Sequence, residues 1–129
     1  MNQNNTKKYK IGDIGPAGGY IFMQYNDGVF LECWIEDEPD RITWDIAYNK
    51  IKTLNHGGFS DWTLPTIKEL NKLYKKKNEI GNFEDYYYWT SIQYSENFAC
   101  CQTFSSFGSQ GSLLKKESTG KVRAVRRFK

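Results

Sequence analysis

The sequence has few of the residues that metal centres and disulfide frameworks require. Its 129 residues contain one histidine and three cysteines, and two of the cysteines are neighbours, Cys100 and Cys101. An odd number of cysteines argues against a set of disulfide bridges, so reduced thiols are the simpler expectation. Adjacent strand residues point to opposite faces, which keeps Cys100 and Cys101 from binding one metal ion together. With no HExxH or CxxC motif either, we expect no metal site and no cofactor.

Long apolar segments and a strong excess of one charge are also missing. No apolar run approaches the roughly 20 residues of a membrane-spanning helix. The net charge is +3, whereas a dedicated nucleic-acid binder usually carries a denser basic stripe. Residues 1–10 are polar and basic with no apolar segment behind them, unlike a secretory signal. We therefore expect no membrane insertion, no nucleic-acid partner, a flexible arm over residues 1–10 and a single domain over residues 11–129.

Aromatic residues and glycines are abundant instead. Phe, Trp and Tyr make up 16% of the chain, and there are 11 glycines. Aromatic rings bury large areas and must supply much of the core, while glycine-rich turns favour many short strands. Residues 20–24 and 29–35 flank an Asn-Asp-Gly turn, which predicts a hairpin. Later strands are predicted at residues 87–93, 98–104, 110–115 and 121–128.

Two helices are predicted between these groups of strands. Apolar residues recur at helical spacing over residues 44–54, where Thr43 is a candidate cap. Thr66 followed by Glu69 forms a capping box for a second helix, and Lys75, Lys76 and Lys77 suit its C-terminal end. The order of strands, then two helices, then strands predicts an α+β domain.

Four features that resemble functional motifs are better explained structurally. His56 is interpreted as a loop or capping histidine, because no partner for acid–base or metal chemistry is evident. The glycine-rich residues 15–19 lack the spacing of a phosphate loop and precede a strand, so a turn is expected. The acidic residues 36–40 are interpreted as a solvated loop rather than a calcium site. The lysines from Lys72 to Lys77 are interpreted as a solvated helix end.

Four segments together resemble one family. They are residues 12–22 (GDIGPAGGYIF), residues 58–66 (GFSDWTLPT) followed by Glu69-Leu70, residues 88–91 (YWTS) and residues 122–128 (VRAVRRF). They resemble, in the same order, the bacterial and phage domain related to the C-terminal domain of the Legionella collagen-like adhesin. The resemblance implies a C-type-lectin-like fold, with two helices packed on short antiparallel sheets and with paired termini.

The last quarter of the chain also resembles the variable proteins of diversity-generating retroelements. In such proteins a lectin-like scaffold displays side chains that a reverse transcriptase rewrites. The resemblance implies a constant set, Gln102, Phe104, Gly108 and Gln110, among variable ligand-binding residues. The implied variable residues are Cys100, Cys101, Thr103, Ser106, Phe107, Ser109, Gly111, Ser112, Leu113 and Leu114. Phe107, Leu113 and Leu114 are expected to form an exposed apolar patch, and the alternative is that these three residues are core.

These observations favour a non-enzymatic domain that binds a protein or glycan ligand. One alternative is an adhesion module of fixed specificity from a phage or bacterium. Another is a cysteine oxidase of the formylglycine-generating type, although those enzymes use a matched pair of active cysteines that the adjacent Cys100 and Cys101 do not resemble. Without a secretory signal, we expect a cytoplasmic or virion-associated protein.

Overall fold

Within residues 8–129 the fold consists of two small antiparallel sheets and three α-helices. The computed structural model describes residues 8–129. The first sheet has the order β1-β2-β6, with strands β1 (Tyr20–Gln24), β2 (Phe30–Cys33) and β6 (Val125–Phe128). The second has the order β3-β4-β5, with strands β3 (Tyr87–Gln93), β4 (Phe98–Thr103) and β5 (Gln110–Leu114). This architecture confirms the predicted α+β class and is consistent with a C-type-lectin-like fold.

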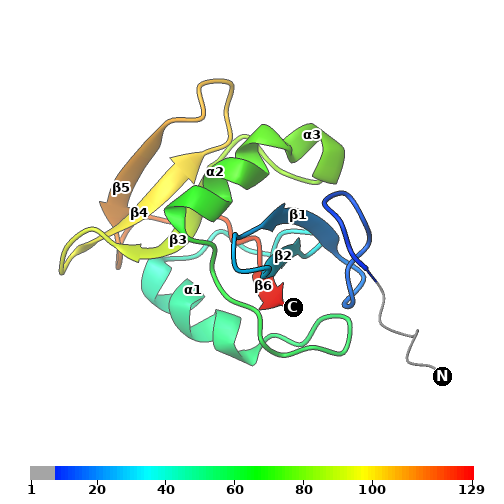
Figure 1. Ribbon diagram of the computed structural model, residues 1–129. Helices are drawn as coiled ribbons and strands as arrows, with labels where there is room; N and C mark the ends of the chain where they lie inside the picture. Colours follow the sequence, from blue (N-terminus) through cyan, green and yellow to red (C-terminus); the bar gives the residue numbers. More distant parts are fainter. Residues whose placement is uncertain (1–7) are drawn as a thin grey trace.

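The helices connect and cover the two sheets. They are α1 (Trp44–Lys50), which continues as a 3-10 turn (Ile51–Thr53), α2 (Ile67–Lys75) and the short α3 (Lys77–Ile80). Helix α2 contacts β1 in one sheet and β3 and β4 in the other, while α1 contacts β3 (Figure 1). The predicted capping box of α2 is present, because Thr66 accepts from the Glu69 backbone and the Glu69 side chain accepts from the Thr66 backbone. Thr43 precedes α1 but makes no side-chain capping bond.

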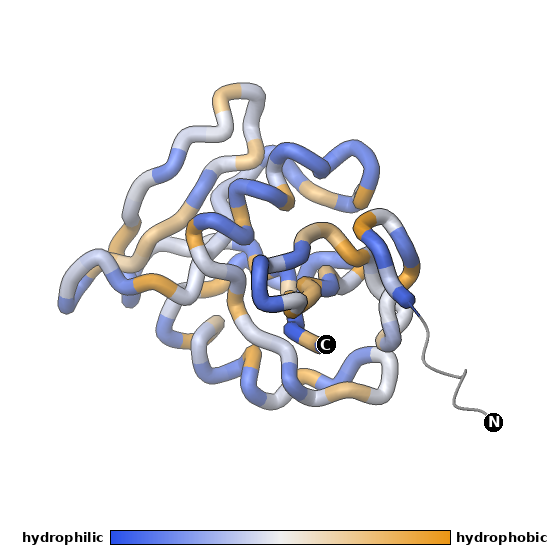
Figure 2. The backbone as a smooth tube through the Cα atoms, in the orientation of Figure 1, coloured by the Kyte–Doolittle hydropathy of each residue, from blue (hydrophilic) through white to orange (hydrophobic). Residues whose placement is uncertain are grey.

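Two buried clusters form the core. One lies around α1 and includes Trp44, Trp62 and Trp89, and the other lies between α2 and the strands and includes Leu70 and Leu73. Helices α2 and α3 are otherwise largely hydrophilic, as the blue tube in Figure 2 shows. The expected aromatic core is therefore confirmed, and one apolar stripe of α2 is enough to join both sheets.

The ends of the domain meet at the first sheet. Strand β6 pairs with β2, so the closing strand completes the N-terminal hairpin. Tyr9 packs edge-on against Phe128, with ring centroids 5.2 Å apart. Because Tyr9 already contacts the domain, the predicted arm over residues 1–10 extends too far toward the C-terminus. Residues 1–7 of that arm lie outside the described range. Strand β6 also starts later than the predicted residue 121. Gly120, Val122 and Ala124 bond with residues 34–42 instead, and Lys121 bonds with β3.

A buried arginine anchors the segment that leads into β6. Arg123 is fully buried, and its Nε donates to Asp37 Oδ1 at 3.0 Å. The same guanidinium donates to the backbone oxygens of Trp34, Gly81 and Asn82. Burial raises the pKa of Asp37, although hydrogen bonds from Tyr88 and Arg123 oppose the shift. One planar donor therefore joins three separate segments of the chain.

Two arginines of β6 repeat this arrangement. Arg126 pairs with the buried Glu32 at 2.9 Å and with Asp61 at 2.8 Å. Arg127 pairs with the buried Glu69, the capping residue of α2, at 2.6 Å. The arginines of β6 thus link this strand to β2, to the loop that contains Asp61 and to the start of α2.

The glycine-rich loop and the acidic loop both involve buried carboxylates. Residues 15–19 form the expected turn, and the turn encloses a carboxylate of the chain itself, because Ala17 and Gly19 donate their N–H groups to Glu32. The acidic residues 36–40 are not simply solvated. The Asp37 side chain is only 8% exposed beside Arg123, and Glu38 is buried against His56, so the prediction of a solvated loop is wrong for these two residues.

Replacing Arg123 should destabilise the domain strongly. The Arg123→Met variant leaves Asp37 buried without its guanidinium, and breaking a buried pair on one side costs about 3–5 kcal/mol. Urea denaturation followed by tryptophan fluorescence measures the free energy of unfolding. Lys10→Ala, which removes an exposed ion pair with Asp13, should change it little. Adding Asp37→Asn to Arg123→Met should restore part of the loss, and an unchanged stability in Arg123→Met would contradict the assignment.

Candidate functional site

The candidate site lies on the outer part of the second sheet. Strand β5 forms the edge of that sheet, and it is joined to β4 by the turn at residues 104–109 (Figure 1). The β4–β5 ladder is regular, with Cys100 opposite Ser112 and Cys101 opposite Gly111. A regular ladder gives each side chain a fixed position, so this segment can present a defined surface.

The residues predicted for the ligand surface differ in exposure. Ser106, Phe107, Ser109 and Gly111 are exposed, and Cys100, Thr103, Ser112, Leu113 and Leu114 are half-buried. With the exception of Leu113, these exposed and half-buried residues form what we call the β4–β5 surface. Leu113 packs against the core cluster around α1, and Cys101 belongs to that cluster and is only 2% exposed. Placing Cys101 and Leu113 on the surface was wrong, because their side chains point toward the core.

The turn between β4 and β5 is fastened to the helices. Tyr74 of α2 donates its hydroxyl to the backbone oxygens of Ser105 and Ser106 at 3.1 and 3.0 Å. The Lys77 ammonium donates to the Phe104 backbone oxygen at 2.8 Å. Phe107 stands at the tip of this turn and is 87% exposed. Because the backbone of this turn is fixed, binding through Phe107 would have to order only the two side-chain torsions of its ring.

Three of the four predicted constant residues support this turn from inside. Phe104 is fully buried between Tyr88 and Phe83. Gln102 is 1% exposed and donates to Asn71 Oδ1 and to the Gly108 backbone oxygen. Gly108 has a φ of +59°, and a Cβ there would overlap the Tyr74 ring. The fourth, Gln110, is exposed, so burial does not constrain it.

A shallow concavity of about 350 Å³ opens beside the edge strand. It is lined by Ile67, Tyr94, Cys100, Cys101, Gln110, Gly111 and Ser112. Tyr94, in the turn after β3, is 72% exposed and was missed by the sequence analysis. The only sequence signal for it was an aromatic residue beside a Ser-Glu-Asn turn. The concavity combines an aromatic ring, a hydroxyl and a thiol, which suits mixed polar and apolar contacts.

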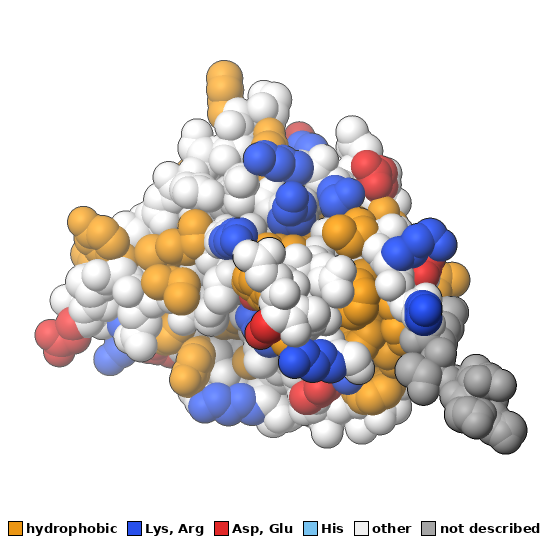
Figure 3. Space-filling view, in the orientation of Figure 1, with side chains coloured by type: hydrophobic (Ala, Val, Ile, Leu, Met, Phe, Trp, Pro, Cys, Tyr) orange, Lys and Arg blue, Asp and Glu red, His pale blue; other side chains and the backbone are white. Residues whose placement is uncertain are grey.

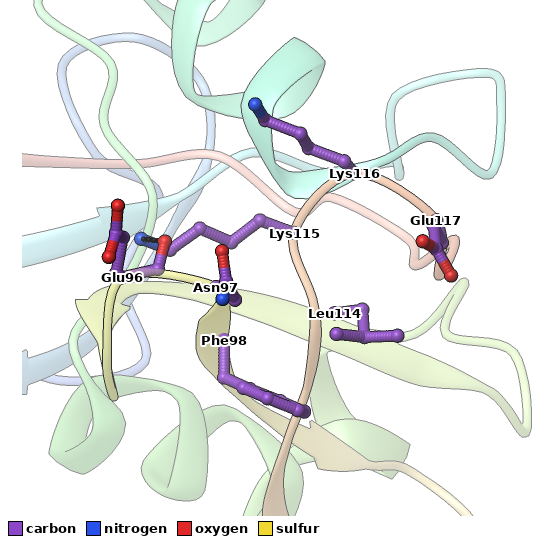
Figure 4. Close-up of a pocket in the computed structure, with 7 residues that line it drawn as sticks. All are labelled: Glu96, Asn97, Phe98, Leu114, Lys115, Lys116 and Glu117. Atoms are coloured by element: carbon purple, nitrogen blue, oxygen red, sulfur yellow. Dashed lines mark hydrogen bonds between the residues drawn. The ribbon is translucent and has the colours of Figure 1, made fainter.

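A second concavity of about 320 Å³ lies at the other end of the β4–β5 ladder. Figure 4 shows Phe98 and Leu114 on neighbouring strands, with the Lys115 amine directed toward Glu96. The Lys115 ammonium donates to Gln93 Oε1 and to the Glu96 backbone oxygen, and lies 5.3 Å from the centre of the Trp44 ring. Lys115 therefore connects the end of β5 to the turn between β3 and β4. Phe98 and Leu114 supply the apolar contact area of this concavity.

The predicted single apolar patch of Phe107, Leu113 and Leu114 is not present. Leu114 pairs with Phe98 at one end of the ladder, Phe107 stands on the turn at the other end, and Leu113 packs inward. Figure 3 shows hydrophobic side chains at several separate places over the second sheet, and lysines and arginines gathered near α2. The surface therefore offers several small apolar contacts separated by serines.

The chemistry available at this surface is limited. Cys100 is the one thiol of the surface, and burial raises the pKa of the neighbouring Cys101 thiol to about 11. Within residues 8–129, no group of three or more His, Cys, Asp or Glu side chains is arranged to hold a metal ion. His56 lies away from these strands, stacked on Trp34 and 2.9 Å from a Glu38 oxygen.

The fold and this surface define an α+β domain whose edge strand and turns carry the accessible side chains. Comparison with protein families matches residues 23–126 to the Lcl C-terminal domain. The match spans most of the sequence, so the chain belongs to the Lcl C-terminal domain family. No curated protein matches the chain. No helix within residues 8–129 is long and apolar enough to cross a membrane.

Thiol labelling tests the placement of the adjacent cysteines. Of the three thiols, only that of Cys100 should react rapidly with Ellman's reagent at pH 8. Cys33 and Cys101 are buried, and burial raises the pKa of each to about 11. The absorbance should report one fast thiol in the native protein and three in urea. The Cys100→Ser variant should lose the fast phase, and two fast thiols in the parent would show that Cys101 is accessible.

Proposed function

We propose that this chain is a ligand-binding domain without catalytic activity, and that its ligand is a protein or glycan bound at the β4–β5 surface. The observation that carries the proposal is Phe107, an almost fully exposed aromatic ring on a turn held by Tyr74 and Lys77. Aromatic anchors of low flexibility are enriched among the residues that dominate binding energy. Membership of an adhesin-related family supports a binding role.

We further propose that the surface is a display surface whose side chains can vary. Ser106, Phe107, Ser109 and Gly111 are exposed, while the core beneath them rests on Gln102 and Phe104. A Cβ at Gly111 would point into open space. Side chains at such positions can change without leaving a cavity, which is the physical requirement for diversification. A near-copy of this coding segment beside a reverse-transcriptase gene would distinguish a diversified module from a phage or bacterial adhesion module of fixed specificity.

A cysteine oxidase of the formylglycine-generating type is the less favoured proposal. Such chemistry needs two thiols that act together, and Cys101 is 2% exposed beside a half-buried Cys100. The thiolate is the form that reacts and binds copper, and burial keeps Cys101 protonated at neutral pH.

Binding should depend on the two most exposed aromatic residues of this region. We expect Phe107→Ala and Tyr94→Ala each to weaken binding at least about tenfold, because each removes an aromatic contact. The assay uses the labelled domain on a glycan array and on intact bacterial cells. Ile14→Ala is the matched control, since Ile14 is 71% exposed and Tyr94 72%, and Ile14 lies beside β1 of the first sheet whereas Tyr94 follows β3 of the second. Equal losses in all three variants, or no saturable binding by the parent, would contradict the proposal.

Gly108 and Gly111, the two glycines between Phe104 and Leu114, should respond oppositely to substitution. Gly111→Thr adds a strand-favouring side chain in open space and should leave the melting temperature unchanged or raised. Gly108→Thr combines a left-handed backbone with an overlap on Tyr74, and should cost at least about 2 kcal/mol. Thermal unfolding followed by circular dichroism measures both. Similar losses in the two variants would contradict a tolerant surface on a constant turn.

A further inference from the structure

Strand β5 has an uncovered edge. Residues 109 and 115 exchange hydrogen bonds with β4, through Thr103 N–H to Ser109 oxygen and Lys115 N–H to Asn97 oxygen. In an antiparallel ladder the bonded residues alternate, so the backbone groups of Gln110, Ser112 and Leu114 point away from β4. Among the described residues, only the Leu114 oxygen has a partner on that side, the Ser118 N–H.

The other sheet edges are each covered by a bridging segment. Ile14 bridges to Tyr20 of β1, Thr63 to Val125 of β6, and Lys121 to Tyr88 of β3. Within residues 8–129, no such bridge reaches β5. Folded proteins usually protect an open edge with lysine, proline or a bulge. The sequence of β5 is QGSLL, and its ladder with β4 has no register shift, so none of these protections is present.

We propose that β5 pairs antiparallel with β5 of a second copy of this chain, across a two-fold axis at Ser112. In that register Ser112 faces its own counterpart, and Gln110 faces Leu114 of the second copy. The Ser112 pair can exchange two main-chain hydrogen bonds through groups that one copy leaves free. Each Gln110–Leu114 pair can form one such bond, from the Leu114 N–H to the Gln110 oxygen, because the Leu114 oxygen already accepts from Ser118.

The charge distribution of β5 favours a second copy as the occupant. In an antiparallel two-fold pairing the residue on the axis faces its own counterpart, so a charge there would face a charge of the same sign. Gln110–Leu114 is uncharged throughout. Beyond it, the register places Lys115 opposite Ser109 and Lys116 opposite Gly108, so no two lysines meet. The proposed β5–β5 pairing therefore places no like charges directly opposite each other, an arrangement that would destabilise the pair.

The pairing is independent of the proposed ligand binding and compatible with it. An edge contact uses main-chain groups and leaves the faces of the sheet free. Side chains of β5 can therefore change without altering the pairing. The resulting six-stranded sheet would place two β4–β5 surfaces side by side, which increases avidity for a repetitive ligand.

The first test removes one outward-pointing donor. Ser112→Pro deletes an N–H that β4 does not use, whereas Ser112→Ala keeps it. Sedimentation velocity from low micromolar to near-millimolar concentration measures the monomer–dimer equilibrium. We expect reversible dimerisation of the parent and of Ser112→Ala, with at least about tenfold weaker association of Ser112→Pro. If the parent stays monomeric, the edge of β5 is left for a strand of a different protein and the proposal is overturned. A Ser112→Pro variant that dimerises with the affinity of the parent overturns it as well.

A cysteine pair tests the register even if the proline variant fails to fold. Hydrogen-bonded antiparallel partners have Cα atoms about 5.5 Å apart, within the span of a disulfide. Ser112→Cys in a Cys100→Ser background should form a disulfide-linked dimer under mild oxidation, on non-reducing gels. Ser109→Cys in the same background is the control, because the register separates the two copies of residue 109 by about 20 Å. Equal cross-linking of both variants overturns the proposed register.

Discussion

The buried ion pairs of the closing segment hold the domain together. Arg123, Arg126 and Arg127 reach carboxylates that lie far earlier in the chain, at Asp37, Glu32 and Glu69. Each of these carboxylates also fixes a further element: Tyr88 donates to Asp37, the glycine-rich turn donates to Glu32, and Glu69 caps α2. Short strands and loops have few apolar contacts of their own, so buried ion pairs between residues far apart in the sequence help to fix their arrangement.

This arrangement separates the stabilising part of the molecule from its accessible surface. The ion pairs and the cluster between α2 and the strands lie around the first sheet and the centre of the molecule. The β4–β5 turn is attached to that centre by Tyr74, Lys77 and Gln102, and its exposed residues Ser106, Phe107 and Ser109 lie outside both core clusters. Because a side chain that stabilises nothing can be replaced at little cost, the outer strand can acquire new contacts independently of folding.

The sequence was informative where local rules operate. The Thr66–Glu69 capping box and the strand patterns predicted α2 and β3 closely, because capping and alternation involve residues close in the chain. Exposure within the β4–β5 surface was harder to predict. Cys100 and Cys101 have the same side chain, and only the second belongs to the buried cluster that includes Trp89 and Ala99. The partner of Arg123 lies 86 residues away, and no local pattern indicates such a pair.

The fastened turn at residues 104–109 limits the kind of change that this surface can undergo. Its backbone is bonded at Phe104, Ser105, Ser106 and Gly108 to groups on α2, α3 and β4. Adding or deleting a residue would shift every one of these bonds, whereas exchanging an exposed side chain such as that of Ser106, Phe107 or Ser109 shifts none. Point substitution at the exposed positions therefore disturbs this turn less than a change in its length. Under the proposed function, related chains would present different side chains on a turn of nearly constant backbone shape, and so would select among ligands of similar shape.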